Sequence, residues 1–242
     1  FYYERTLRSS ADVVPDEKGA AFRRLVTGEQ KTGDGMAKPY GVAVQAGKLY
    51  VADTVRKEVL LFDQAGQRFR GIGSDDPGAL GMPLGLDLDA QGNLYVADGL
   101  LRRVMVYDSG GKYLRAVGID QLKYRPSGVA VDPAGSRVYV VETGELSGEG
   151  HRVRVFDARG GMHLFDIGKR GSGPGEFNLP RDLALAPNGE LYVVDGGNFR
   201  VQVFAPDGNY LREFGSVGQQ SGQFSRPKEI AVDRQGRLYV VD

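Results

Sequence analysis

Short apolar runs alternate with polar, glycine-containing turns along most of the chain, and this alternation recurs in units. Each unit holds four runs, of which the second resembles LYVAD, the third RVQVF and the fourth YLREF. Short runs rich in Val, Tyr and Phe between turn residues are typical of β-strands. DAQGN, DPAGS, APNGE and DRQGR stand between first and second runs, and Asp or Asn near Gly favours a hairpin. The pattern predicts four antiparallel strands per unit.

Five prolines open the units, and successive prolines are 44, 43, 54 and 47 residues apart. They are Pro39, Pro83, Pro126, Pro180 and Pro227. This is the period of a propeller blade. The longest step contains an insertion, GELSGEGH (144–151), and the fifth unit holds only its first two runs. We therefore predict an all-β chain, a β-propeller of four-stranded antiparallel blades, with about four and a half blades that start near residues 38, 82, 125, 179 and 226.

Residue size within the units agrees with this fold. The first run carries small residues such as Gly85 and Gly128, whereas the second carries tyrosines such as Tyr95 and Tyr139. Small side chains suit strands crowded around a propeller axis, and large rings fill the wider gaps between blades. Both faces of each sheet are expected to be covered, since the strands read as nearly continuous apolar runs.

The segment LYVVDGGNFRVQVF (191–204) closely resembles the repeat of the NHL-repeat β-propellers, as do the linkers GSGPGEF (171–177) and SGQF (221–224). The resemblance covers about residues 38–242. It implies six blades in a full protein, of which this chain would be a part. It also implies a bacterial protein of the periplasm or cell surface, secreted or held by a lipid anchor outside this chain.

Residues 1–37 precede the repeats and are predicted to form a separate N-terminal region. YYERTLRSS (2–10) resembles a lone outer strand that could complete the last blade. DEKGAAFRRLVTG (16–28) suits a short helix with Phe22, Leu25 and Val26 on one face and Gly28 at its end.

An acid ends the second run of every unit, and in three units an arginine begins the third run. The two runs flank one hairpin, so the pattern predicts a repeated structural ion pair, with a ring of functional carboxylates as the alternative. The first unit departs from the pattern, because Glu58 stands where arginine is expected. The predicted pairs are Asp98 with Arg103, Glu142 with Arg152, and Asp195 with Arg200.

Blade linkers and the hairpins between second and third strands should share one face of the propeller. Basic and aromatic residues there are candidate binding residues, mixed with acids that also suit an ordinary solvated face. The 144–151 insertion on this face is either a binding edge or a tolerated loop. The candidates are Arg56, Arg102, Arg125, His151, Arg181, Phe199, Arg226 and Lys228.

The composition and the residue spacing argue against several kinds of partner and site. Lys and Arg together number 31, as do Asp and Glu, so the balanced charge argues against nucleic acid as a partner. The chain has no cysteine, and no apolar run reaches the length of a membrane span. His151 and His163 fall on different elements and do not suggest a zinc site. GSGPGEF lacks the spacing of a phosphate-binding loop.

We predict no catalytic residue, metal or cofactor, and a non-catalytic binding scaffold that presents propeller loops to a protein, peptide or glycan. Protein or peptide is the expected partner. The family resemblance leaves an alternative open: a metal-dependent lyase or lactonase-like hydrolase with its site at the central channel. Calcium bound there through oxygen ligands stays possible. Such a site would lie near Asp182, Glu229 or Arg125.

Overall fold

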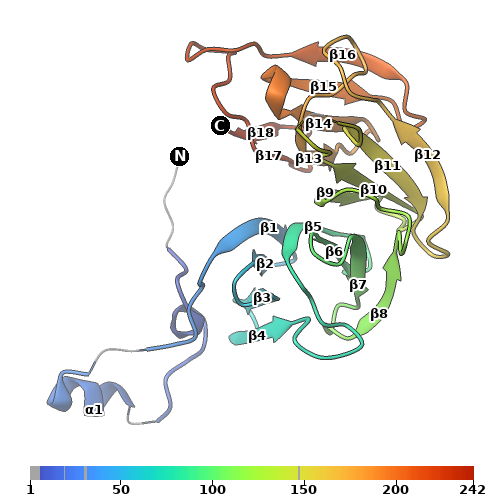
Figure 1. Cartoon of the computed structure of the whole chain (residues 1–242). Helices are drawn as coiled ribbons and strands as arrows, with labels where there is room; N and C mark the ends of the chain where they lie inside the picture. The colour runs from blue at the N-terminus through green and yellow to red at the C-terminus, as the bar shows by residue number, and fades with distance from the viewer. Residues whose placement is uncertain (1–5, 19, 30–31, 147) are drawn as a thin grey trace.

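The described part of the chain folds into four sheets of four antiparallel strands and one sheet of two, each made of strands that follow one another in sequence. The computed structural model describes residues 6–18, 20–29, 32–146 and 148–242. Figure 1 shows the five sheets side by side about a common centre, with β1, β5, β9, β13 and β17 innermost. The predicted all-β propeller of four-stranded blades is confirmed.

The strand bounds follow the sequence units closely. The first blade consists of β1 (Pro39–Gln45), β2 (Lys48–Asp53), β3 (Glu58–Asp63) and β4 (Arg68–Ile72), and the second of β5 (Pro83–Leu88), β6 (Leu94–Asp98), β7 (Arg103–Tyr107) and β8 (Tyr113–Val117). The third consists of β9 (Pro126–Val131), β10 (Arg137–Glu142), β11 (Arg152–Asp157) and β12 (His163–Ile167). The fourth consists of β13 (Pro180–Leu185), β14 (Leu191–Asp195), β15 (Arg200–Phe204) and β16 (Tyr210–Phe214), and the last sheet of β17 (Glu229–Val232) and β18 (Leu238–Val241).

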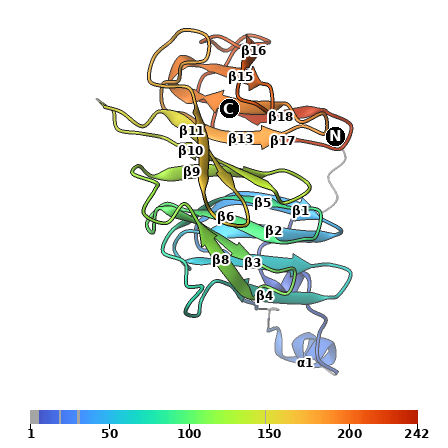
Figure 2. The same cartoon turned by 90° about the vertical axis from the view of Figure 1, so that its right-hand side faces the viewer.

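The hydrophobic core is divided into layers that lie between neighbouring blades. One layer joins Tyr95 and Val104 of the second blade to Val138 and Phe156 of the third, and all four side chains are buried. Strand β6 is buried along its whole length, because its two faces contact two different blades. Figure 2 shows the sheets stacked in the same order when the molecule is turned. Sheets covered on both faces explain the unbroken apolar runs.

Glycine in the innermost strands has a steric reason. A Cβ atom added to Gly85 would come within 2.7 Å of the Gly128 Cα and 2.9 Å of the Ser127 carbonyl oxygen. A Cβ on Gly41 would clash with the Leu84 carbonyl oxygen. The backbones of the inner strands of the first three blades therefore approach too closely at Gly41 and Gly85 for any larger residue.

The N-terminal region packs on the first blade. Its described part contains a 3-10 helix, η1 (Ser10–Asp12), and a helix, α1 (Ala20–Thr27), that projects away from the blades in Figures 1 and 2. Leu7 and Val13 pack on a cluster that includes Phe62 of β3. The expected helix is present, but its apolar residues Phe22, Leu25 and Val26 are exposed.

The lone strand expected at residues 2–10 is corrected in part. Residues 1–5 lie outside the described residues, and residues 6–10 form no strand beyond an isolated bridge between Ser9 and Gly35. Ser9 instead caps η1, and η1 lies beside β4 of the first blade. Leu7 of this segment packs on the first blade, and residues 6–10 do not pair with a strand of the last sheet.

Candidate functional site

The acids that end the second strands are buried clamps for the backbone. Asp98 is completely buried, and its carboxylate accepts hydrogen bonds from the N–H groups of Gly81 (2.6 Å), Met82 (3.1 Å), Leu100 (3.0 Å) and Leu101 (2.9 Å). Two of these donors belong to the segment that enters the blade and two to the hairpin that follows β6. One carboxylate thus holds both the entry segment of the second blade and the hairpin between β6 and β7.

The same arrangement recurs in the other blades. Asp53 accepts from the N–H groups of Ala37 and Lys38, which precede β1, at 2.6 and 3.1 Å. Glu142 accepts from the N–H of Tyr124 (3.0 Å), and Asp195 from that of Asn178 (2.7 Å). The repeated acid is therefore part of the architecture, as the repetition of the motif indicates.

Two of the three predicted ion pairs are brought together. The Arg152 Nε lies 2.8 Å from a Glu142 carboxylate oxygen, and the Arg200 Nε lies 2.9 Å from an Asp195 oxygen. Burial raises the pKa of Asp195, although the Asn178 N–H, the Asn198 amide and the Arg200 guanidinium act in the opposite direction.

The third pair, Asp98 with Arg103, is corrected. The two residues face each other across β6 and β7, but no ion pair joins them within the described part of the chain. Backbone donors already occupy the Asp98 carboxylate. In the first blade Glu58 takes the arginine position, and Arg56 lies 3.3 Å from it.

The hairpins between second and third strands hold their residues in a fixed, left-handed turn. Lys57, Arg102 and Phe199 occupy equivalent positions with φ values of 59°, 51° and 56°. In the first two blades the N–H of this residue donates to the carbonyl of the clamp acid, at 2.9 Å from Lys57 to Asp53 and 3.0 Å from Arg102 to Asp98. In the fourth blade Phe199 ends the 3-10 helix η2 (Gly196–Asn198). Recurrence in three blades identifies this strained geometry as a structural turn.

We call the surface made by these hairpins and the blade linkers the linker face. Arg102 donates to the Lys123 carbonyl (2.9 Å), and Arg56 is half-buried against the Gly35 carbonyl (3.2 Å) and Glu58. Phe199 is half-buried. The predicted binding residues with exposed side chains are Arg102, Arg125, Arg181, Arg226 and Lys228.

His151 has a different place from the one expected, because it is buried, with 1% of its surface exposed. Its Nε2 lies 2.7 Å from the Glu145 carbonyl oxygen, and its Nδ1 accepts from the Leu179 N–H at 2.8 Å. The ring therefore carries its proton on Nε2 and ties the 144–151 insertion to the linker before the fourth blade. This residue braces a loop and offers no group to a binding partner.

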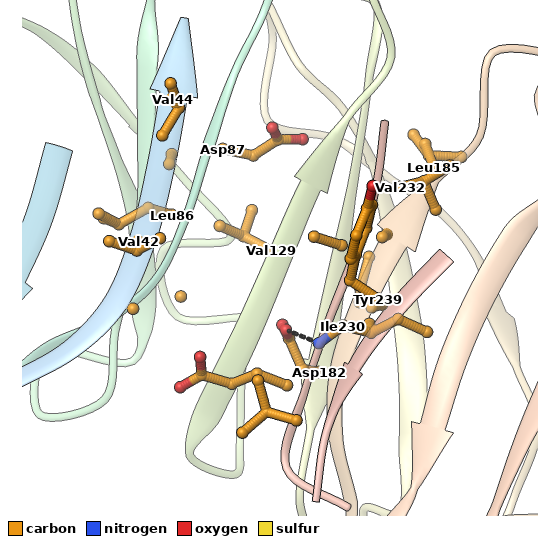
Figure 3. A pocket seen from close by; sticks show the side chains of 18 of the residues that line it. Val42, Val44, Leu86, Asp87, Val129, Asp182, Leu185, Ile230, Val232 and Tyr239 are labelled. Carbon is orange, nitrogen blue, oxygen red and sulfur yellow. Dashed lines mark hydrogen bonds between the residues drawn. The ribbon is translucent and has the colours of Figure 1, made fainter. Parts of the chain in front are cut away.

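A cavity of about 610 Å³ lies at the centre of the molecule, lined by the five innermost strands and by β18. Its walls are mainly aliphatic, with Val42, Val129 and Ile230 among them (Figure 3). Asp87 of β5 and Asp182 of β13 also line it. Cavities of this size and polarity are typical of small-ligand sites.

The two cavity carboxylates make hydrogen bonds across blade boundaries. An Asp87 oxygen accepts from the Val131 N–H (2.8 Å), and an Asp182 oxygen accepts from the Ile230 N–H (3.1 Å), which Figure 3 shows as a dashed line. Burial raises the pKa of Asp87 to about 6 and that of Asp182 to about 7, against the effect of these N–H donors.

Sequence reasoning marked Asp182 and Glu229 as channel positions but missed Asp87. The available signal was a departure from the repeat, since GLDLD in the second unit has Asp where the others have Ala. The third of these residues, Arg125, lies over the hairpin that follows β6. Its Nε would be 3.3 Å from a Cβ atom added to Gly99.

The described residues lack two kinds of feature. Among them no three His, Cys, Asp or Glu side chains are grouped so that they could hold a metal ion. In that same part of the chain, no helix combines the length and apolar character needed to cross a membrane.

Known proteins were compared with the chain at the level of sequence. The family model described as "NHL repeat" matches residues 177–204. E3 ubiquitin-protein ligase TRIM32 from Homo sapiens is 47% identical over 47 residues, which are 19% of this chain and 7% of that protein. NHL repeat-containing protein 3 from Homo sapiens is 31% identical over 84 residues, 30% of this chain and 22% of that protein. The matches thus span a minor part of each relative.

Solved structures give the same architecture. A streptogramin B lyase superposes with a TM-score of 0.64 and 16% identity, over 85% of this chain and 62% of the lyase. A chain of a nidogen/laminin complex superposes with a TM-score of 0.62 and 20% identity, over 84% of this chain and 72% of the other. At such identities the likeness concerns the fold alone.

Proposed function

Because the chain is made of NHL repeats that fold as propeller blades, we propose that it is a non-catalytic binding scaffold whose linker face engages a protein partner. The observation that carries the proposal is the construction of that face. Exposed cations, among them Arg102 and Arg181, stand on a hairpin and a blade entry that the buried carboxylates of Asp98 and Asp195 hold in place. Preorganised side chains lose little conformational entropy on binding.

The relatives agree with a protein partner. TRIM32 is named as a ubiquitin-protein ligase, and the chain that superposes from the nidogen/laminin structure was solved in a complex of two proteins. Both names describe other proteins, of which this chain matches a part. They support the proposal because TRIM32 shares a segment of sequence with this chain and the chain of the nidogen/laminin complex shares its fold.

The repeated acids favour a scaffold over a catalytic centre. Asp53, Asp98, Glu142 and Asp195 are fully buried and accept backbone N–H groups, so none of them presents a carboxylate to a substrate. The lyase alternative is supported by likeness to solved lyase structures such as the streptogramin B lyase, whose 16% identity shows a shared fold alone.

Photo-cross-linking tests the proposal. p-Benzoylphenylalanine would replace Arg102 or Arg181 on the linker face, and in matched controls Asp207 or Gln235, which lie in exposed turns at the opposite end of the blades. In extract of the source organism, we expect adducts of one defined mass from the linker-face positions, competed by excess unlabelled wild-type protein. Equal labelling from both ends of the blades, or labelling that excess protein does not reduce, would refute the proposal.

A further inference from the structure

The central cavity departs from the repeat at two positions. Asp87 stands where the other units have alanine, and Asp182 stands where the first three units have glycine. The equivalent residues are Ala43, Ala130, Ala184 and Ala231 for Asp87, and Gly41, Gly85 and Gly128 for Asp182. Blades fold without a carboxylate at either position. Local departures of this kind are expected at functional sites more than in the scaffold.

Neither carboxylate has a cationic partner. Each accepts backbone N–H groups, and within the described residues no Lys, Arg or His lies within ion-pair distance of Asp87 or Asp182. Arg181, which also lines the cavity, lies with its Cγ 2.9 Å from the position of a Cβ on Gly196, over the hairpin of its own blade. Lys228 and Arg234 line the cavity as well, but among the described residues no cation forms an ion pair with Asp87 or Asp182, and Glu229 adds a further acid beside Asp182.

Two tyrosines complete the cavity wall. Tyr40 of β1 and Tyr239 of β18 line it and are 41% and 50% exposed. The Tyr239 hydroxyl donates to an Asp233 oxygen at 3.2 Å, which fixes the ring. Figure 3 shows Tyr239 among the aliphatic residues that line the cavity. Tyrosine faces attract cations, and more strongly where water is partly excluded.

We propose that this cavity binds an alkylammonium group, either a free organic amine or a lysine side chain of a bound protein. The aliphatic walls suit the methylene chain, the tyrosines suit the cationic end, and the carboxylates supply the opposite charge. An anion would be repelled, and a neutral apolar ligand would displace water from both carboxylates without supplying an opposite charge, which is costly. A bound ammonium ion also favours the ionised state of the two acids, which burial disfavours. The cavity borders the linker face, since Arg181 and Lys228 line it, but the inference does not depend on the function proposed for that face.

Calorimetric titration of the whole chain at pH 8 tests the inference with three probes of similar length: n-pentylamine, pentan-1-ol and pentanoate. We expect pentylamine to bind at least tenfold more tightly than either of the others. A lysine-containing tripeptide with blocked ends distinguishes the two sources of the ammonium group. Tighter binding of the tripeptide identifies a protein lysine, and equal or tighter binding of pentylamine identifies a free amine.

The double variant D87A/D182G restores the residues that the repeat has elsewhere, and we expect it to weaken pentylamine binding at least tenfold. D87N/D182N keeps the shape of both side chains and should weaken binding to a similar degree, so a folding defect in one variant leaves the other informative. An exposed acid in a distant turn, Asp207→Asn, serves as the control and should bind pentylamine as wild type does. Pentanol binding as tightly as pentylamine, tighter binding of pentanoate, or unchanged affinity in both double variants would overturn the proposal.

Discussion

An Asp182 carboxylate oxygen accepts a hydrogen bond from the Ile230 N–H, 3.1 Å away, and thereby joins the fourth blade to the sheet of β17 and β18. The bond crosses a blade boundary at the level where adjacent inner strands otherwise touch through glycine. In the fourth blade a charged side chain thus takes the place of direct backbone contact.

Stability should depend on pH through Asp182. Burial raises the pKa of Asp182 from 3.8 to about 7, so the folded state binds more protons than the unfolded state between these values. The contribution of this residue to the free energy of unfolding therefore falls as pH rises from about 4 to about 7. Partial exposure reduces the effect below its upper limit of about 4 kcal/mol. We expect Asp182→Asn to be more stable than wild type by about 1 to 2 kcal/mol at pH 8 and nearly equal to it at pH 5.

Denaturant unfolding at the two pH values measures this difference. Glu229 and Asp87 also raise the pKa of Asp182, so the variant should be compared in the otherwise unchanged chain. A difference between Asp182→Asn and wild type that is the same at pH 5 and pH 8 would show that Asp182 does not titrate in this range.

Removal of a clamp acid should be severe. Asp98→Ala leaves the N–H groups of Gly81, Met82, Leu100 and Leu101 without their acceptor. We expect a loss of about 4 kcal/mol in the free energy of unfolding, since each buried unsatisfied donor costs about 1 to 3 kcal/mol and solvent relieves part of the total. Urea unfolding provides the measurement.

Asp108→Ala is the matched control for the clamp. Asp108 also accepts two backbone N–H groups, from Gly110 and Lys112 at 2.9 Å each, but it lies in a partly exposed turn where water can replace it. Its loss should cost about 1 kcal/mol or less. Similar losses for Asp98→Ala and Asp108→Ala would contradict the role given to the buried acid.

Contact between inner strands should make Gly85 irreplaceable. Gly85→Ala places a methyl group within 2.7 Å of the Gly128 Cα and within 3.0 Å of the Val129 nitrogen, and both are backbone atoms that cannot turn aside. We expect a loss of about 2 to 3 kcal/mol by thermal or chemical unfolding. Gly35→Ala, whose new methyl group meets only the Arg8 carbonyl oxygen at 3.6 Å, should change stability by less than about 1 kcal/mol. Equal tolerance of both substitutions would mean that the inner strands can separate freely.

The insertion in the third blade should depend on His151. His151→Ala removes both the bond to the Glu145 carbonyl and the acceptor of the Leu179 N–H. We expect faster cleavage after Glu145 and Glu149 by a glutamyl endopeptidase, with the blades still folded. His163→Ala, whose ring is partly exposed and lies 2.6 Å from Asp166, should be cleaved at the wild-type rate. A wild-type rate for His151→Ala as well would show that other contacts hold the loop.

Blade number and strand order could be predicted because each unit carries its own local signals. Pro39, Pro83, Pro126 and Pro180 begin inner strands, and Asp or Asn near Gly marks the turns between strands. Pairing occurs between strands adjacent in sequence, so the repeat alone was sufficient to define each sheet.

Interactions between units were harder to predict. Spacing suggests that Asp98 pairs with Arg103, but it does not show that linker N–H groups reach the carboxylate first. Its place at the end of an insertion made His151 a candidate binding residue. The side chain is buried instead, because the loop folds back onto the next linker. Asp87 and Asp182 share a cavity only because blades two and four face a common centre.

The clamp has a consequence for how such a chain can change in evolution. The acid and the entry residue that it holds are 16 positions apart in the case of Asp53 and Ala37, so a repeat counted from its linker contains both. A duplication or deletion of a whole repeat therefore includes both the acid and the N–H groups that it binds. A newly gained repeat would already contain these hydrogen bonds.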